Sequence, residues 1–395
     1  MTPTRLEHGR AAAVRSARAA PPGLRPTWVE VDLDAISANV AALKAQAAAP
    51  RLAAVVKADG YGHGAVPAAR AALAGGADWL AVALVEEGRE LRDAGIDAPT
   101  LVLAEPPPAA AGALLDAGLV SAVYTPAFTE ALDAAARERG MRADVHVKLD
   151  TGMHRVGVPE ADWADALRRV RDAAGLHLSG LWSHFAVADE PDHPFIARQS
   201  AAFRRGLDLA TSLGIRPDLV HLCNSAGTLH LPADHYDMVR PGLSVYGLEP
   251  APGLAGATPL RRALAWYSQL SLVKRVAAGE PVSYGLRWAP DRDTVVATVP
   301  VGYADGVTRA LTNRAQVLVG GRLRSLVGTV TMDQVLVDLG SDGGGAPGDE
   351  VCLIGAQGSE RITAEDWAEL LDTINYEIVC TVGARVPRVH LGGAT

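Results

Sequence analysis

Lys57 stands at the end of an apolar run, a position where a lysine can act as a nucleophile. The run covers residues 53–57 (AAVVK), and glycines follow at Gly60, Gly62 and Gly64. Burial disfavours the charged form of lysine, which lowers its pKa and frees the amine that a Schiff base requires. The glycines would allow a ligand to approach the backbone closely. The pattern also fits a lysine with a buried stem and a solvated charge.

A second group of polar candidates follows two later apolar runs. Ser225 comes after the seventh of eight such runs, and Gly242 and Leu243 come after the eighth. Loops after strands seven and eight of a (β/α)8 barrel often bind phosphate through backbone N–H groups and a hydroxyl. These residues are therefore candidate phosphate ligands. For Ser225 alone, capping of a helix that opens at Asn224 is an equally good interpretation.

The elements that must position these residues alternate between short apolar runs and Ala- and Leu-rich helical stretches such as 66–74 and 160–173. This alternation is typical of a parallel sheet covered by helices, and eight repeats in about 230 residues fit a closed (β/α)8 barrel. Barrel active sites lie at the carboxyl ends of the strands, where these polar residues stand. The expected strands are 52–57, 79–84, 100–104, 121–125, 144–149, 179–184, 219–222 and the very short 238–240.

After about Leu264 the pattern changes to short Val-rich runs with turns between them, which predicts a mainly β domain. One helix is expected within it, with Thr363 as N-cap, Asp366 three residues on, and apolar residues from Trp367 to Ile374 at helical spacing. We therefore expect a disordered tail over 1–26, the barrel over 27–262 and the β-rich domain over 263–395. The β-domain strands are expected at 269–276, 294–301, 316–319, 334–339 and 350–354.

Composition narrows the class of protein. A net charge of −8 argues against a nucleic-acid partner, and apolar stretches such as 80–85 are too short for a membrane span. Three cysteines, Cys223, Cys352 and Cys380, favour a reducing compartment over a disulfide framework. The first 25 or so residues are Arg-rich but carry no apolar signal region, which favours a disordered tail over an organelle presequence. We expect a cytoplasmic protein without a metal site.

The sequence around Lys57 resembles the cofactor-attachment segment of bacterial alanine racemases, which are fold-type III pyridoxal-phosphate enzymes. Further segments resemble that family in the same order, from about Trp28 to Gly392. One match alone would be moderate support, whereas the ordered set favours the functional interpretation of Lys57. The segments are VKADGYGHG (56–64), KLDTGMHRVG (148–157), HFA (184–186), HLCNSA (221–226), VRPGLSVYG (239–247), VSYG (282–285), GYADG (302–306), TMDQ (331–334) and INYE (374–377).

The resemblance implies pyridoxal 5'-phosphate as cofactor and assigns its contacts. Arg240 would face the pyridine nitrogen, and since arginine does not give up its proton, the ring would be a weaker electron sink, which suits racemisation. His221 would hold this arginine, and His184 would pack beside the ring. Without the resemblance, Arg240 would be interpreted as a surface ion-pair partner and His221 as an ordinary core histidine. The implied phosphate contacts are Tyr61, Asn224, Ser225, Gly242, Leu243 and Tyr376.

Racemisation needs a base on each face of the planar carbanion. The resemblance implies that Lys57 serves one face and Tyr284 the other, with Tyr284 supplied by the second domain of a partner chain. The protein is then expected to be a homodimer with shared active sites that interconverts L- and D-alanine and supplies D-alanine for peptidoglycan. A free tyrosine has a pKa of about 10, so Tyr284 would need help from nearby positive charge or hydrogen bonding. Otherwise, Tyr284 would be a packing aromatic in a β-strand.

The remaining implied residues contact the amino-acid substrate or support the site. Arg155 would contact the substrate carboxylate and the phenolic oxygen of the cofactor, and Met332 would offer its backbone N–H to the same carboxylate. Lys148, carbamylated in some family members, would fix Arg155. Tyr303 and Arg309 would line the entry corridor.

Small departures from the common family pattern are His154 in place of a frequent glycine, Thr331 where a cysteine is common, and Val187 where a threonine is frequent. None removes a catalytic group. Three other functions remain open at this point: a broader amino-acid racemase, a barrel-type decarboxylase and a non-catalytic carrier of the cofactor. The absence of an export signal argues against the first, and the second domain argues against the last.

Overall fold

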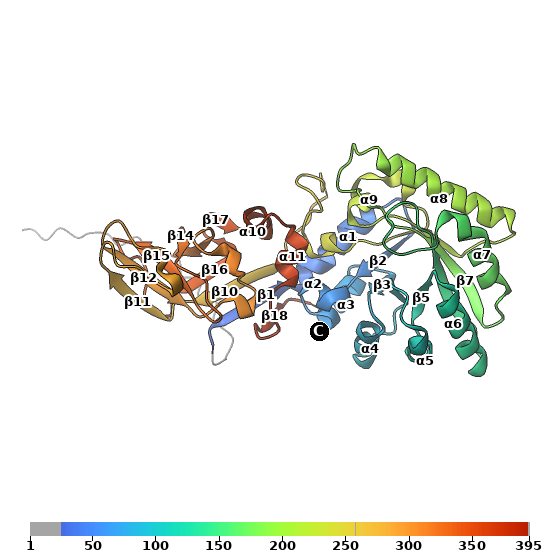
Figure 1. Cartoon of the computed structure of the whole chain (residues 1–395), viewed down its shortest axis with the longest axis horizontal. Helices are drawn as coiled ribbons and strands as arrows, with labels where there is room; N and C mark the ends of the chain where they lie inside the picture. Colours follow the sequence, from blue (N-terminus) through green and yellow to red (C-terminus); the bar gives the residue numbers. More distant parts are fainter. Residues whose placement is uncertain (1–24, 257, 394–395) are drawn as a thin grey trace, which may run out of the picture.

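The computed structural model describes residues 25–256 and 258–393. Two domains lie end to end, a barrel with its outer helices and a smaller β-rich domain, with helices α10 and α11 close to where they meet (Figure 1). The predicted disordered tail covers residues 1–26, of which residues 1–24 lie outside the described part. Arg25 is described, and its guanidinium bonds to Asp305 in the β-domain at 2.7 Å.

The barrel is built from eight parallel strands, which confirms the predicted fold class. All eight expected strands are present, with bounds that differ by a few residues. The strands follow the order β8-β7-β6-β5-β4-β3-β2-β9 in the sheet. The last barrel strand, β9, pairs with the first, β2, so the sheet curls into a nearly closed barrel. The strands are β2 (Arg51–Val55), β3 (Trp79–Val82), β4 (Thr100–Val102), β5 (Val120–Val123), β6 (Ala143–Lys148), β7 (Leu176–Trp182), β8 (Leu219–His221) and β9 (Met238–Val239).

Helices cover the outside of the barrel, because each crossover between parallel strands needs a segment that buries its apolar face against the sheet. α6 shows how the chain begins such a helix: Thr125 caps it by accepting the Phe128 N–H, and Pro126 fills the first turn. The helices are α1 (Leu33–Gln46), α2 (Lys57–Tyr61), α3 (Ala65–Ala74), α4 (Val85–Asp93), α5 (Ala111–Asp116), α6 (Pro126–Glu138), α7 (Trp163–Asp172), α8 (Phe195–Ser212) and α9 (Ser225–His230).

The second domain is a mainly antiparallel ten-stranded sheet. The predicted strand 269–276 is wrong as one element, because the chain forms two strands that are separated by residues 270–271. The first, β10, pairs with β16, and the second, β11, pairs with β12 towards the other end of the sheet. Three further strands, β14, β17 and β18, were not predicted. The predicted strand that begins at residue 269 includes only the last residue of β10. The strands are β10 (Leu264–Gln269), β11 (Leu272–Val276), β12 (Thr294–Val299), β13 (Gln316–Val319), β14 (Arg322–Val327), β15 (Val335–Gly340), β16 (Glu350–Gln357), β17 (Glu360–Ile362) and β18 (Arg388–Leu391).

The first strand of the chain, β1 (Thr27–Asp32), belongs to this second sheet rather than to the barrel. It pairs antiparallel with β10 and parallel with β18. The predicted barrel over 27–262 had included it. The reason is that a short apolar run carries no information about its partner, and here the strands from the two ends of the chain lie side by side.

The predicted helix of the β-domain is present as α10 (Ala364–Leu371). Thr363 accepts the Asp366 N–H, and the Asp366 side chain accepts the Thr363 N–H, which is a capping box. The helix ends earlier than predicted, because Asp372 adopts a left-handed conformation with φ 54°. Ile374, expected on its apolar face, instead precedes the next helix, α11 (Asn375–Cys380), and is 59% exposed.

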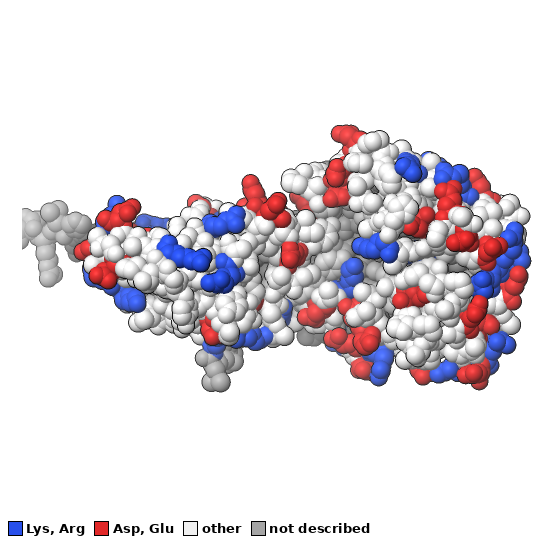
Figure 2. All heavy atoms as spheres, in the orientation of Figure 1, with Lys and Arg blue, Asp and Glu red and all other residues white. Residues whose placement is uncertain are grey.

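Acidic and basic side chains alternate over the outside of the barrel, and uncharged residues predominate where the two domains meet (Figure 2). The interior of the barrel also holds charged and polar groups at its carboxyl end, among them His146, Lys148, His221 and Arg240, all nearly inaccessible to solvent. Within residues 25–256 and 258–393, no helix has the length and apolar character needed to cross a membrane.

Candidate active site at the barrel mouth

Lys57 begins a tight turn of left-handed backbone directly after β2. The next three residues have φ of 53°, 53° and 60°, a conformation unfavourable for L-residues. Two carboxylates hold the turn: Glu87 on α4 accepts the Ala58 N–H at 2.7 Å, and Asp59 accepts the Ala65 N–H at 2.8 Å. The turn therefore fixes where Lys57 lies relative to the strand.

The half-buried Lys57 has a pKa below the ordinary lysine value. Burial is the main cause, and the positive charge of Arg155 adds to it, whereas Glu87 and Cys380 act in the opposite direction. A lower pKa increases the fraction of free amine at neutral pH. The electrostatic surroundings therefore suit the nucleophile predicted from the sequence.

Arg240, just after β9, is buried and makes hydrogen bonds with four partners. Its guanidinium donates to the backbone oxygens of Ser183 and Leu222 at 2.9 and 3.1 Å, and to His221 Nδ1 at 2.7 Å. His221 Nε2 lies 2.8 Å from His146 Nδ1. Burial lowers the pKa of Arg240 to about 9, so it remains a cation at neutral pH.

This chain of contacts determines the tautomers of both histidines. Arginine has donors only, so His221 Nδ1 must accept and its Nε2 must carry the hydrogen. His146 Nδ1 then accepts that hydrogen, and His146 Nε2 carries its own, without a hydrogen-bond partner among the described residues. Burial and Arg240 lower the pKa of His146 to about 3 and that of His221 well below its usual value, which keeps both rings neutral.

His184 follows β7 and forms the fourth contact of the same guanidinium. Its Nδ1 lies 3.3 Å from Arg240 Nη2 and accepts for the same reason. Burial is the main cause of its lowered pKa, and the charges of Arg240 and Lys148 add to the effect. The structure therefore brings together three of the predicted residues, His184, His221 and Arg240.

Four cationic side chains meet at this end of the barrel. Lys148 Nζ lies 4.3 Å from the centre of the Trp182 ring, and the Arg240 guanidinium carbon lies 4.7 Å from the same ring. Burial first, and then the charges of Arg240, Arg155 and Lys57, lower the pKa of Lys148 to about 7. Like charges brought together in this way are stabilised by an anionic ligand.

A cradle of small and hydroxyl-bearing residues lies beside the cations. Ser225 Oγ accepts the Gly242 N–H at 2.8 Å and the Ser244 N–H at 3.4 Å. Gly242 faces the Tyr61 hydroxyl so closely that a Cβ at this position would collide with it. The Tyr61 ring lies 6.3 Å from that of Tyr376 on α11.

The other predicted phosphate contacts frame this cradle. Asn224 caps α9 by accepting the Gly227 N–H at 3.0 Å, and the buried Leu243 begins a short 3-10 turn. Burial raises the pKa of Tyr376 to about 12 and raises that of Tyr61 further, so both phenols keep their protons at neutral pH. Protonated phenols are hydrogen-bond donors, which matches an anion such as phosphate.

Arg155 lies in the loop after β6, close enough to Lys57 for its charge to lower the lysine's pKa. The loop is held by Asp150, which accepts the N–H groups of Gly152 and His154 at 2.9 and 3.1 Å. His154 has φ 55°, a conformation that glycine adopts without strain, and its ring contacts the same carboxylate at 3.0 Å. The departure at His154 is therefore accommodated next to Arg155.

Four of the residues predicted in the second domain do not join this group within one chain, unlike Tyr376. Tyr284 lies on an exposed 3-10 turn, where Ser283 and Gly285 adopt positive φ angles that interrupt extended structure. The alternative interpretation of Tyr284 as a packing aromatic in a β-strand is therefore wrong. Tyr284 is 75% exposed, Met332 52% and Tyr303 42%, and Arg309 is also exposed. These four residues therefore lie on the surface of the β-domain.

Sequence reasoning missed several residues that shape the site. His146 could have been found, since it lies two residues before Lys148 on the same strand and alternate residues of a strand share a face. Glu87, which holds the Lys57 turn, and Trp182, which lies against two cations, gave no comparable signal. Their roles depend on tertiary contacts alone.

Comparisons with known proteins agree with this geometry. The alanine racemase N-terminal domain family matches residues 31–250, and the alanine racemase C-terminal domain family matches residues 263–390. A protein of Symbiobacterium thermophilum named alanine racemase is 49% identical, over 94% of this chain and 99% of its own. One from Thermobifida fusca is 48% identical, over 92% and 97%.

Solved structures show the same relationship. The crystal structure of alanine racemase from Streptomyces lavendulae has a TM-score of 0.91 and 44% identity, covering 94% of this chain and 98% of its own. The alanine racemase of Bacillus anthracis, solved with bound L-Ala-P, has a TM-score of 0.88 and 36% identity, covering 94% and 96%. Both domains, their order and nearly the whole described chain are shared, and the chain therefore belongs to the alanine racemase family.

Proposed function

We propose that this chain is a pyridoxal-phosphate-dependent racemase that interconverts L-alanine and D-alanine. The observation that supports this most strongly is the meeting of four basic side chains at the carboxyl end of the barrel, where both lysines have a lowered pKa: Lys57, Lys148, Arg155 and Arg240. Four cations arranged in this way fit an anionic cofactor and a carboxylate substrate. Family membership supplies the reaction.

The residues present fit pyridoxal phosphate. A Cβ at Gly242 would fill the space in front of the Tyr61 hydroxyl, so glycine keeps this cradle open. Tyr61, Ser225 and Tyr376 would hold the phosphate, together with Asn224 and the backbone of Gly242 and Leu243. Lys57 would attach the cofactor, His184 would lie beside its ring, and Arg155 would contact its phenolic oxygen. When bound, the cofactor stabilises negative charge at the substrate α-carbon.

Arg240 would be the partner of the pyridine nitrogen. As a cation that stays protonated at neutral pH, it can only donate a hydrogen bond, so the nitrogen remains an acceptor without a proton of its own. The neutral tautomers of His221 and His146 support this state, because each ring accepts from the side of Arg240. This arrangement limits the electron sink and favours return of the proton over side reactions.

The proton would be moved by two bases. Lys57 Nζ takes it from D-alanine, and Tyr284 Oη takes it from L-alanine on the opposite face. Because Tyr284 is exposed on the β-domain and apart from Lys57, it would serve the site of a second copy of the chain. We propose a homodimer in which Tyr284, Met332, Tyr303 and Arg309 of one protomer complete the site of the other.

We propose that the protein works in the cytoplasm and supplies D-alanine for peptidoglycan. Cys223 is a buried thiol and Cys380 an exposed one, and neither forms a disulfide, which is compatible with a reducing compartment. Met332 would present its backbone N–H to the substrate carboxylate, and Lys148 would position Arg155 for the same group.

The test of this function has two parts. Polarimetric assay of the purified protein against a panel of L-amino acids should give fastest racemisation with alanine. Reduction with borohydride followed by digestion should leave the cofactor on Lys57. A label on another lysine would reject the site, and faster turnover of another amino acid would reject alanine as the main substrate.

A further inference from the structure

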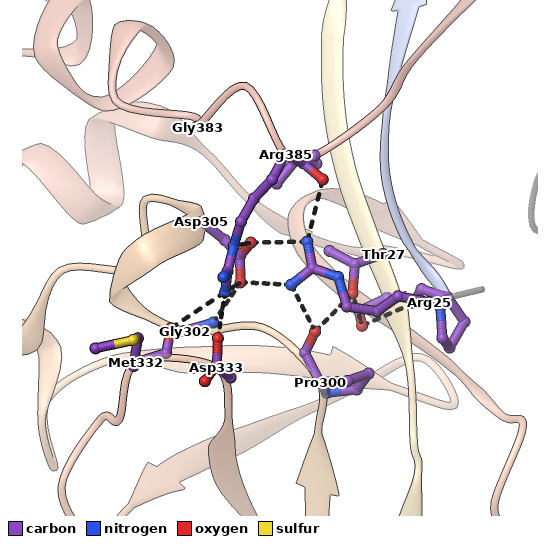
Figure 3. Close-up of polar contacts among 12 residues, drawn as sticks. Arg25, Thr27, Pro300, Gly302, Asp305, Met332, Asp333, Gly383 and Arg385 are labelled. Atoms are coloured by element: carbon purple, nitrogen blue, oxygen red, sulfur yellow. Dashed lines mark hydrogen bonds and ion pairs between the residues drawn. The ribbon is translucent and has the colours of Figure 1, made fainter. Parts of the chain in front are cut away.

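Asp305 lies at the centre of an ion cluster in the β-domain that the catalytic assignment does not use (Figure 3). Its side chain is fully inaccessible to solvent. Arg25 contacts its two oxygens at 2.7 and 2.8 Å, and Arg385 contacts them at 2.6 and 3.2 Å. Burial acts to raise the pKa of Asp305, but the bonds from Arg25 and Arg385 outweigh it, so the pKa lies below its usual value.

The cluster joins three segments that are distant in the sequence. Arg25 precedes the first strand, Arg385 precedes the last, and Asp305 lies between β12 and β13. Arg385 also reaches Asp333 at 2.7 Å and the backbone oxygen of Met332 at 3.4 Å. Figure 3 shows that the Arg385 guanidinium lies between Asp305 and residues 332–333.

The same cluster holds the backbone of Met332 from a second direction. Asp305 accepts the Gly302 N–H at 2.9 Å, which closes the turn that follows β12. A Cβ at Gly302 would collide with the backbone oxygens of Thr331 and Met332, so the two segments are in direct contact. The Tyr303 N–H donates to the Thr331 oxygen at 2.9 Å, and the Ala304 N–H donates to the Met332 oxygen at 3.1 Å.

A backbone N–H binds a carboxylate well only when its peptide plane is fixed beforehand. The side chain of Met332 is 52% exposed and gives little anchoring of its own. The peptide that carries the Met332 N–H also carries the Thr331 oxygen, which the Tyr303 N–H holds, and the following peptide is held through the Met332 oxygen by Ala304 and Arg385. Asp305 fixes both sets of donors, because it binds Arg385 and the Gly302 N–H next to Tyr303. The anchoring groups are all on the chain that carries Met332.

We propose that Asp305 is a positioning residue for substrate binding in the partner subunit, acting through Arg385 and Gly302 on the backbone of Met332. This inference rests on the proposed function, since it assumes that Met332 faces the substrate carboxylate of the other protomer. Asp305 touches neither substrate nor cofactor. Its effect should therefore appear in the KM for alanine more than in kcat.

The experiment uses heterodimers with one working site, purified through two different affinity tags. One chain carries Lys57→Ala and the other Tyr284→Phe, so the working site takes Lys57 from the second chain and Tyr284 and Met332 from the first. Asp305→Asn is then added to the first chain or to the second. Both heterodimers have the same composition, and any loss of folding stability is shared.

With Asp305→Asn on the Lys57→Ala chain, the KM for alanine should rise about tenfold, the loss expected for a weakened charged contact. On the Tyr284→Phe chain the KM should match that of the parent heterodimer, because this Asp305 serves the inactive site. An equal rise in both heterodimers would overturn the proposal and leave Asp305 a purely structural role. A rise only in the second would also overturn it and point to an effect through α11, which Gly306 contacts at Thr381.

Two further variants keep the result interpretable. Asp342→Asn removes the same charge from an exposed ion pair with Arg322 and should change the KM in neither position. Arg385→Lys keeps the charge but loses the two-pronged contact with Asp305, and it should give the same dependence on subunit if the Asp305→Asn chain does not fold. Failure of the parent heterodimer to racemise alanine would instead reject the shared site.

Discussion

The mouth of the barrel and the exposed face of the β-domain hold the two halves of the proposed machinery in opposite ways. Arg240 is 3% exposed and makes hydrogen bonds with four groups of its own chain. Lys148 is 5% exposed and lies over the Trp182 ring. Tyr284 is 75% exposed. The comparison teaches that one chain by itself buries and fixes the residues proposed to hold an anionic cofactor, whereas the residues proposed to contact the substrate from the other side are left exposed for a second surface.

Physical chemistry explains the division. Buried cations are costly unless a counter-charge is present, and burial first, then the neighbouring positive charges, lower the pKa values of Lys57 and Lys148. An exposed tyrosine is not strained, but an apolar aromatic ring left in water gains from being covered. Binding of an anionic cofactor would therefore stabilise the cations at the barrel mouth. Pairing of protomers would cover the exposed tyrosine of the β-domain.

The largest effect is expected from Lys57→Ala. Loss of both the attachment point and one base should lower racemisation by about 10⁴-fold or more in both directions. The control is Lys44→Ala, which removes a lysine on the outside of the barrel whose Nζ lies 2.9 Å from Asp78 Oδ2. This variant should racemise alanine as fast as the unmodified protein. Rates come from polarimetry with each enantiomer. Full activity of the Lys57→Ala protein would show that the barrel mouth takes no part in the reaction.

Tyr284→Phe tests the other region and should slow racemisation by about 10²–10⁴-fold. The rates of conversion from L- to D-alanine and from D- to L-alanine must fall by the same factor, because a mutation cannot change the equilibrium between enantiomers. Single-turnover exchange in deuterated solvent should slow far more for L-alanine than for D-alanine. Equal slowing for both would mean that a single base acts and that the exposed face supplies none.

His146→Gln sharpens the comparison through pH. Burial lowers the pKa of His146 to about 3 in the folded protein, against about 6.5 when unfolded, so unfolding takes up a proton below pH 6.5. Above pH 6.5 the neutral ring makes its full contribution to the free energy of unfolding. This contribution is lost as the pH falls from 6.5 towards 3. At pH 5 the loss is about 2 kcal/mol.

Urea unfolding of both proteins at pH 7 and pH 5 measures this contribution. The wild-type free energy of unfolding should fall more steeply than that of His146→Gln. Parallel falls would show that the ring does not stay neutral in the barrel, and the tautomer chain from Arg240 would be incorrect.

The smallest effect is expected in the β-domain, from Thr363→Ala. Removal of the hydroxyl that caps α10 should cost about 1 kcal/mol, seen as a lower thermal midpoint of the transition that includes this domain. Thr363→Ser keeps the hydroxyl and should restore most of the loss. An unchanged midpoint with alanine would mean that the Asp366 side chain alone satisfies this end of the helix.

The sequence predicted the barrel well because its strands are buried on both sides and read as continuous apolar runs. Even the short run 238–240 forms β9, which pairs with β2. The β-domain was predicted less well. Three of the six residues of β14 (Arg322–Val327) are exposed, and β17 and β18 are only three and four residues long, so periodicity gives little signal for them.

The candidate site shows the same limit. Lys57 became a candidate from its position at the end of an apolar run, and the ordered set of family segments then favoured its functional interpretation. Arg240 became a candidate from its motif. Contacts between residues far apart, such as Glu87 with Ala58 or Arg25 with Asp305, leave no periodic trace in the sequence. The alternative interpretation of Tyr284 as a packing aromatic assumed a β-strand, and the positive φ of Ser283 was not visible from residue type.

The left-handed turn after Lys57 has a consequence for protein engineering. Three non-glycine residues, Ala58, Asp59 and Tyr61, adopt φ between 53° and 55°, and each such residue costs roughly 1–2 kcal/mol in an L-chain. The segment cannot hold this shape by its own preferences. A designer who transplants residues 56–64 into another barrel would obtain a relaxed loop and a displaced amine. The graft becomes functional only if the carboxylate of Glu87 and the helix that carries it are moved as well.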